Sequence, residues 1–266
     1  MSQLFRLLGT WAKLDRAGDH IDTLKENVRD LLRVEDEDPQ PYGFHFDPDS
    51  GEGVGWIEWM PDPPTIYWSL VAGDAVHNLR GALDHLMWQV AILDRGGGVP
   101  EDRTQFPIVD DPAHLTGWPA SVTMNQLTEP HRTLVAGYQP YNAGDLKDVH
   151  PLAILRELSN QDKHRVLAIL SLLGDCYVDP TTRDCVIEEG RPHIGVELKK
   201  GAEVVHIRTR AIGPNPELDV KLYVLPEITI GEDVPLIPLL DIIQACITGI
   251  TAEFDPDFRQ AEGTPK

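Results

Sequence analysis

The spacing of apolar residues changes along the chain, and this change constrains the fold more than any other feature. Up to about residue 173, apolar residues recur every three to four positions, as they do on one face of an α-helix. After that they alternate with polar residues, as in half-buried antiparallel strands, at Ile194/Val196/Leu198, Val205/Ile207/Thr209/Ala211 and Val220/Leu222/Val224. The sequence therefore predicts an α+β fold, mainly a helical bundle, with a C-terminal helix and a small antiparallel sheet formed by an N-terminal hairpin and strands at about 190–230.

Four helices are expected before the sheet. The first carries an apolar seam at Trp11, Leu14, Ala17, Ile21, Leu24, Val28 and Leu31. The second covers about residues 66–94 and ends at three consecutive glycines, Gly96 to Gly98. A short helix is expected near 123–136, and a fourth begins at Pro151 and continues to about Leu173. Residues 42–60 have the pattern of a β-hairpin with a turn between Asp47 and Gly51.

These elements predict one domain over residues 1–266. A helical bundle at 10–173 would include the hairpin at 42–60, followed by a β region at 174–232, a closing helix at 236–254 and a loose tail at 255–266. A chain of 266 residues supplies enough apolar side chains for one sizeable core.

Acidic residues dominate the charge of the chain. It has 43 Asp and Glu against 23 Lys and Arg, which gives a formal net charge of −20. Such a surface repels polyanions, which counts against non-specific DNA binding and against anionic membranes. A specific site needs only a few cations, so a local basic pocket is compatible with this charge.

Cysteine usage and hydropathy point to a cytoplasmic protein. Cys176, Cys185 and Cys246 are odd in number and lack Cys-x-x-Cys spacing, so neither a disulfide framework nor a structural zinc site is expected. No apolar run reaches the roughly 18 residues of a membrane span, and no apolar signal-peptide core precedes Gly9.

The expected second helix has a polar face suited to phosphodiester chemistry. Its apolar face carries Ala72, Ala75, Leu79, Leu83, Leu86, Val90 and Leu93, and its polar face carries Asp74, His77, Asn78, Arg80, Asp84 and His85. Arginine is a permanent cation with several donors, and histidine titrates near neutrality. Trp88 lies on this polar face with Gly73 and Gly81 nearby, which predicts that another element packs closely there.

The expected fourth helix carries a carboxylate where an apolar residue belongs. Asp162 lies four positions after Leu158 on the apolar stripe, with Arg165 at its edge. Charged residues on such a stripe are rare unless they are paired or functional. Two interpretations stay open: a structural ion pair of Asp162 with Arg165 or Arg80, or a functional site.

The segment from Arg80 to His85 resembles the Arg-x4-His motif of the HEPN superfamily. The resemblance implies a helical, usually dimeric protein, and many members are metal-independent endoribonucleases of toxin and antiphage systems. The family often has a polar residue after the arginine; this chain has Gly81, and Asn78 one turn earlier is a candidate substitute. Strings between residues 66 and 166 also resemble bacterial and phage proteins, without implying an activity: His77-Asn78-Leu79-Arg80, Leu83-Asp84-His85, Phe106-Pro107-Ile108, Gln139-Pro140-Tyr141 and Asn160 with Asp162-Lys163-His164-Arg165.

The resemblance implies roles for the residues of both helices in RNA cleavage. Arg80, with Lys163 or Arg165, would hold the scissile phosphate. His85 would take the proton of the 2′-hydroxyl, and His164 or His77 would protonate the leaving oxygen. The product would be a 2′,3′-cyclic phosphate, with no metal or cofactor. Asn78, Asp84 and Asp162 would support this site, RNA would be the partner, and the protein would be a homodimer.

Two other functions compete with this hypothesis. The first is a non-catalytic binding or assembly protein, whose polar helix pair forms a dimer interface or a ligand pocket. Its recognition surfaces would be the aromatic residues Trp56, Trp59, Tyr67, Trp68 and Trp88. The second is a metal site across the helices, with candidate ligands Asp74, His77, His85, Glu157 and His164. The absence of a Glu-x-x-His pair disfavours this metal site.

Overall fold

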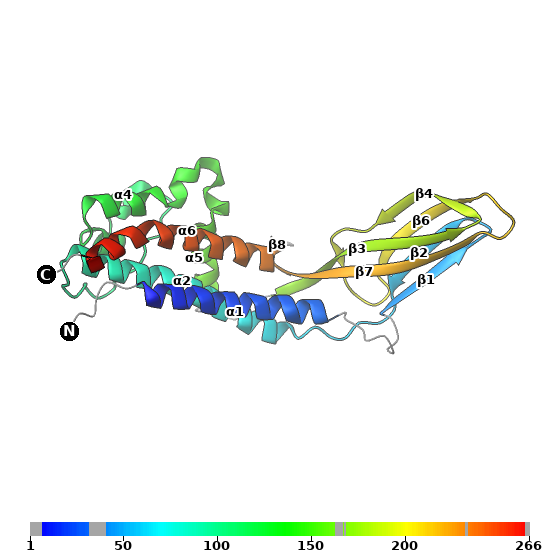
Figure 1. Cartoon of the computed structure of the whole chain (residues 1–266), viewed down its shortest axis with the longest axis horizontal. Coiled ribbons are helices and arrows are strands. Elements are labelled where there is room, and N and C mark those ends of the chain that lie inside the picture. The colour runs from blue at the N-terminus through cyan, green and yellow to red at the C-terminus, as the bar shows by residue number, and fades with distance from the viewer. Residues whose placement is uncertain (1–6, 32–40, 163–166, 168, 232–233, 264–266) are drawn as a thin grey trace. The chain divides into compact units, whose positions relative to one another are not determined.

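The computed structural model describes residues 7–31, 41–162, 167, 169–231 and 234–263 (Figure 1). It divides the chain into two compact units, and each is described by itself. The helical unit comprises the segments up to Thr23, Tyr67–Leu167 and from Pro238, and the β unit comprises Leu24–Ile66 and Ala168–Ile237. The α+β prediction is confirmed. The single domain over residues 1–266 stays a prediction.

Six α-helices and two 3₁₀ helices lie among the described residues. The α-helices are α1 (Leu8–Asp30), α2 (Thr65–Asp94), α3 (Ala120–Met124), α4 (Glu129–Gly137), α5 (Pro151–Asp162) and α6 (Leu236–Gly263). The 3₁₀ helices are η1 (Pro112–Leu115) and η2 (Pro140–Val149). The helix expected near 123–136 is therefore two short helices, α3 and α4, separated by a turn.

Helix α2 is the central element of the helical unit. Six residues of its expected apolar face have no exposed surface: Ala72, Ala75, Leu79, Leu83, Leu86 and Val90. The helix ends where the glycines predicted an end. Gly96 donates to the carbonyl of Leu93 and Gly97 to that of Ile92, both with positive φ, which is the Schellman arrangement.

Glycines allow α1 to approach α2 and α6 closely (Figure 1). A Cβ on Gly9 of α1 would lie 2.7 Å from Nδ1 of His85, and a Cβ on Gly81 of α2 would lie 3.1 Å from Nζ of Lys13. On the side of α6, Gln244 donates to the Leu14 carbonyl at 3.1 Å. The close packing expected at Gly81 is therefore present, and α1 provides it.

Two predicted helix ends are wrong. Helix α5 ends at Asp162, and Ile169 and Leu173 belong to a strand instead of continuing the helix to 173. An apolar run of this kind suits a buried strand as well as a helix, so periodicity alone cannot separate them. At the other end of the chain, α6 continues past 254 to Gly263, because Phe254 and Phe258 extend its buried face.

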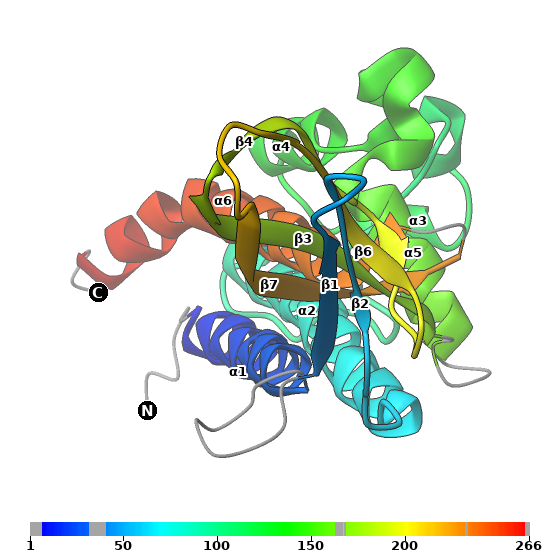
Figure 2. The ribbon, with the colours of Figure 1, turned by 90° about the vertical axis from the view of Figure 1, so that its right-hand side faces the viewer.

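The β unit consists of two four-stranded antiparallel sheets (Figure 2). One has the order β1-β2-β6-β4 and the other β5-β3-β7-β8. The strands are β1 (Tyr42–Asp47), β2 (Glu52–Ile57), β3 (Ile169–Arg183), β4 (Cys185–Pro192), β5 (Val196–Glu197), β6 (Glu203–Ala211), β7 (Glu217–Ile230) and β8 (Val234–Pro235). The expected hairpin at 42–60 is confirmed, and it pairs with β6 in one sheet, as predicted for the strands at about 190–230. The sequence predicted one small sheet, however, and the structure has two.

Two glycines of β2 make room for side chains between the sheets. A Cβ on Gly53 would lie 3.0 Å from Leu218, and a Cβ on Gly55 would lie 3.0 Å from Leu222, both on β7. Phe44 covers the same glycines from β1. Glycine within a strand often marks such a close approach. The spacing of these glycines therefore serves packing.

Helix α6 is the one described helix that is long and apolar enough to cross a membrane, judged by length and composition alone. Its residues Leu240, Ile243, Ile247 and Ile250 are fully buried within the protein. A core helix passes the same test, so this observation is weak support for a membrane span. The cytoplasmic location stays a prediction.

Candidate ligand pocket

A pocket of about 630 Å³ opens in the helical unit beside the polar face of α2. Pockets that bind small molecules measure roughly 300–1,000 Å³. Helix α2 contributes His77, Arg80 and Asp84, and α5 contributes Arg156, Ser159 and Asn160. The remaining lining is Gly81 of α2, residues 105–109, His114 and residues 117–120, which include the first residue of α3. The pocket thus lies between the two helices that the sequence singled out.

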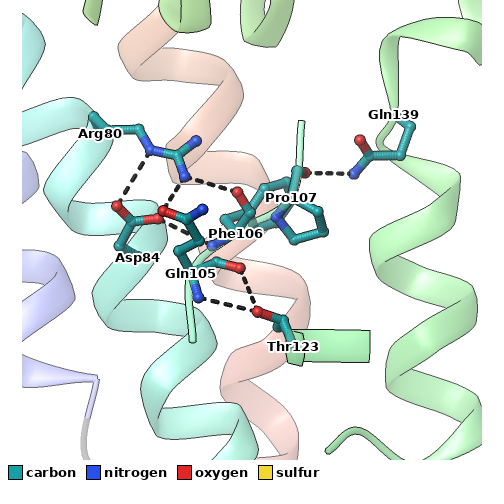
Figure 3. Close-up of polar contacts among 7 residues, drawn as sticks. All are labelled: Arg80, Asp84, Gln105, Phe106, Pro107, Thr123 and Gln139. Atoms are coloured by element: carbon teal, nitrogen blue, oxygen red, sulfur yellow. Dashed lines mark hydrogen bonds and ion pairs between the residues drawn. The ribbon is translucent and has the colours of Figure 1, made fainter. Parts of the chain in front are cut away.

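One side of this pocket is the wall segment, residues 105–109, which belongs to no helix or strand. Phe106 and Ile108 on this segment are buried, so its backbone has little access to water. Buried backbone groups need hydrogen-bond partners. Figure 3 shows that side chains from several elements provide them.

Arg80 and Asp84 together hold the backbone of Phe106. Arg80 binds Asp84 through Nε at 3.2 Å and Nη2 at 2.7 Å, and its Nη2 also donates to the Phe106 carbonyl at 2.8 Å. The Phe106 amide donates to Asp84 Oδ1 at 3.0 Å. The side chains of Arg80 and Asp84 are 15% and 34% exposed, so water screens this pair only in part. This pair occupies both backbone polar groups of Phe106.

Thr123 and Gln139 hold the two ends of the wall segment. The Thr123 hydroxyl accepts from the Gln105 amide at 3.0 Å and donates to the Gln105 carbonyl at 2.8 Å. The Gln139 side chain has no exposed surface; it accepts from the Val109 amide and donates to the Pro107 carbonyl, each at 2.9 Å. The wall is therefore fixed by side chains of α2, of α3 and of Gln139, the residue before η2.

A second arginine approaches the wall from α5. Arg156 binds Asp110 at 2.8 Å, and it donates a long hydrogen bond of 3.4 Å to the Ile108 carbonyl. Both side chains are 33% exposed. Two arginines thus flank the pocket, and each is partly neutralised by a carboxylate.

The mouth of the pocket carries exposed groups suited to binding a planar molecule. The Trp118 side chain is 71% exposed, and the Arg103 guanidinium lies 5.8 Å from its ring centroid. His77 and His114 line the same pocket and are both exposed. An exposed indole ring offers a stacking surface, and histidine and arginine side chains can bind an anionic group.

His85 lies apart from this pocket, on the side of α2 that faces α1. Its ring packs against Gly9, and its buried Nδ1 has no hydrogen-bond partner among the described residues. Burial lowers the pKa of His85, and the nearby positive charge of Lys13 lowers it further. The Arg-x4-His motif is thus split: Arg80 lines the pocket, and His85 contacts α1.

The other site residues expected from the sequence do not line the pocket or lie outside the described residues. Asp162 ends α5 with its carboxylate against Gly73, so the close approach expected at Gly73 is present. Arg80 binds Asp84, and no ion pair between Arg80 and Asp162 is present among the described residues. A pair of Asp162 with Arg165 stays a prediction, because Arg165 lies outside those residues. Asn78 donates to the Asp74 carbonyl of its own helix at 2.8 Å. Lys163, His164 and Arg165 lie outside the described residues.

No metal centre forms among the residues that the structure describes. No group of three His, Cys, Asp or Glu residues in that part of the chain is arranged to hold an ion. Of the expected ligands, His77 lines the pocket while His85 faces α1, so the two point to different surroundings.

Comparisons with known proteins found no match: no family model, no curated protein and no solved structure is similar to this chain. The functional argument therefore depends on the pocket itself.

Several pocket residues were not predicted as site residues. The sequence did not indicate His114, Trp118 or Arg156 as site residues. Gln139, which holds the wall segment, was named only in the string Gln139-Pro140-Tyr141 that resembles bacterial and phage proteins. The one sequence signal near the pocket mouth is a tryptophan directly before a proline, Trp118-Pro119. Nothing in the spacing indicated that Gln139 would reach back to the wall segment, because that contact joins residues 30 and 32 positions apart.

Proposed function

We propose that the helical unit binds a small molecule in the pocket, and that Arg80 and Asp84 build this pocket instead of carrying out catalysis. The observation that carries the proposal is the wall segment, whose backbone is held by Arg80, Asp84, Thr123 and Gln139. A wall fixed in advance reduces the entropy that a ligand must lose on binding. Buried polar networks of this kind keep a cavity open in one shape.

The lining indicates the chemistry of the ligand. Val109 and Pro119 offer partly exposed apolar surface, and Trp118 offers an aromatic face. The cationic side chains Arg80 and Arg156, with the two histidines at the mouth, favour an anionic group. The expected ligand is therefore a small planar organic anion.

A pair of matched probes tests this proposal. 2-Naphthoate has a planar body and a carboxylate, and 2-naphthalenemethanol has the same body without the charge. At about 0.3 kcal/mol per non-hydrogen atom, 2-naphthoate should bind with a Kd of about 1 mM, measured by ligand-observed NMR. The neutral probe should bind several-fold more weakly. Equal binding of both probes, or saturable binding of neither, contradicts the proposal.

Two tryptophan variants place the binding in the pocket. Trp118→Ala removes an exposed ring from the mouth and should weaken 2-naphthoate binding by about fivefold, because stacking contributes about 1 kcal/mol. Trp59→Ala is the matched control, since Trp59 is also exposed, at 56%, and does not line the pocket. Equal effects of the two variants would show that the probe binds elsewhere.

RNA cleavage is the second candidate function, favoured by the presence of Arg80, His77 and His114 in one pocket. In this arrangement His77 and His114 would exchange protons with the substrate, since His85 faces α1. The test is cleavage of RNA in EDTA with formation of a 2′,3′-cyclic phosphate. Activity lost in His77→Ala or His114→Ala but kept in His85→Ala would support this candidate; no cleavage by the wild type removes it. RNA and homodimer partners stay predictions.

A further inference from the structure

A buried histidine joins three helices of the helical unit away from the pocket. His131 on α4 is 6% exposed, and both of its ring nitrogens face carboxylates. Nδ1 lies 2.8 and 2.9 Å from the two oxygens of Asp94, the last residue of α2. Nε2 lies 3.1 Å from Asp257 on α6.

Only the charged imidazole can donate to both carboxylates. A neutral ring carries one N–H and one lone pair, so one of the two carboxylates would then face a lone pair. Asp94 also accepts from the amide of Thr128 at 2.6 Å and is nearly buried, with a side chain 5% exposed. Asp257 is 46% exposed, so its side of the ring is the one that water reaches.

Helix α6 is weakened next to Asp257. Pro256 lies inside the helix and has no N–H, so the helical hydrogen bond at that position is missing. On either side of the proline, Phe254 and Phe258 are buried, and Phe254 lies 5.5 Å from the His131 ring. The contact between His131 and Asp257 therefore supports the last part of α6 at the point where its own hydrogen bonding is interrupted.

We propose that His131 is a protonation-dependent latch that holds the part of α6 after Pro256 against α2 and α4. The latch is closed while both nitrogens carry protons. When the Nε2 proton passes to water, its lone pair faces Asp257, and that side of the latch opens while the Nδ1 contact to Asp94 persists.

The charged groups that face the ring are Asp94 from α2 and Asp257 from α6. On its own helix, Arg132 is paired with Glu129, and on α6 Asp255 is paired with Arg259. The hydrogen bond that His131 donates to Asp94 raises the pKa of His131, burial lowers it, and Asp257 raises it again, with a net increase. A raised folded-state pKa stabilises the closed form fully below the ordinary histidine value of about 6.5, and this stability is lost as pH rises through the raised pKa.

Hydrogen exchange measured by mass spectrometry tests the latch. After correction for the intrinsic rates, protection of residues 257–263 should fall about tenfold between roughly pH 6 and 9, because one charge-assisted hydrogen bond is lost. A peptide from residues 240–250 should show no such change. In Asp257→Asn the fall should move to lower pH, because the neutral amide stabilises the imidazolium less.

Asp255→Asn is the matched control, since Asp255 lies on the same helix and binds Arg259. It should leave the transition in residues 257–263 unchanged. NMR titration of the His131 ring in the wild type gives a second, independent measurement, and its pKa should lie above the ordinary histidine value. A ring that titrates at or below that value, or exchange after Pro256 that does not depend on pH, would overturn the latch.

Discussion

At the scale of single residues, the two ends of the Arg-x4-His motif have different surroundings. Arg80 is bound to Asp84 and to the backbone of Phe106, whereas His85 is packed against Gly9, and its Nδ1 has no hydrogen-bond partner in the described part of the chain. The resemblance of this motif to a family stays a prediction, and spacing on one helix cannot show which neighbours each side chain meets. Because Arg80 and His85 are five residues apart on α2, their side chains lie on different sides of the helix. Helix α1 covers the side that carries His85.

His85 should make the protein less stable in mild acid. Burial and the charge of Lys13 lower its folded-state pKa, so the unfolded state binds the proton more readily. Stability is then complete above the ordinary value of about 6.5 and falls as pH decreases below it. In urea unfolding at pH 7.5 and pH 5 (about one unit either side of that value), the wild type should lose more stability than His85→Gln. An equal loss in both proteins would contradict the assignment.

Gln139 is expected to be among the more sensitive residues of the helical unit. Gln139→Leu keeps a similar volume but leaves the Val109 amide and the Pro107 carbonyl without partners. At about 1–3 kcal/mol for each of these two unsatisfied groups, the free energy of unfolding should fall by about 2–6 kcal/mol. Gln161→Leu is the control, because Gln161 is exposed on α5 and binds only Glu157 of its own helix. A loss below about 0.5 kcal/mol for Gln139→Leu, the usual range of surface changes, would show that the wall is not held in this way.

At the scale of secondary-structure elements, the close contact of α1 and α2 depends on a glycine. A Cβ on Gly9 would collide with the His85 ring, whereas a Cβ on Gly249 of α6 would meet nothing within 4 Å. Gly9→Ala should therefore lower the free energy of unfolding by about 1–3 kcal/mol. Gly249→Ala should raise it by up to about 1 kcal/mol through helix propensity. Thermal unfolding of both variants distinguishes them; stabilisation by Gly9→Ala would contradict the close packing.

Elements with strong local signals could be predicted, and those that depend on distant partners could not. The end of α2 at Gly96 and Gly97 and the hairpin at 42–60 follow from turn chemistry. The apolar run around Ile169 could not be assigned from the sequence, because it forms a strand through pairing with β7, which is distant in the sequence. The wall segment has no periodicity, so its position depends on side chains up to 32 residues away. For this reason Arg80 and Asp84 could be named from the sequence as site residues, whereas the wall segment and its contact with Gln139 could not.

At the scale of the whole molecule, the net charge of −20 limits the partners. Polyanions are repelled over distances of about a Debye length, roughly 10 Å at 0.1 M salt. Binding of a random-sequence DNA duplex at about 50 mM salt should therefore be weaker than the ~100 μM end of the usual non-specific range. Fluorescence anisotropy of a labelled duplex measures this, and a Kd near 1 μM would show a basic surface outside the described residues or in the pocket.

The central claim is that polar side chains of the helical unit hold the wall segment of a ligand pocket. Amide hydrogen exchange of Phe106 and Val109, measured by NMR, tests it most directly. Both amides should be protected in the wild type, Asp84→Ala should deprotect Phe106, and Gln139→Ala should deprotect Val109. Wild-type amides at these two positions that exchange as fast as in an unfolded chain would contradict the claim.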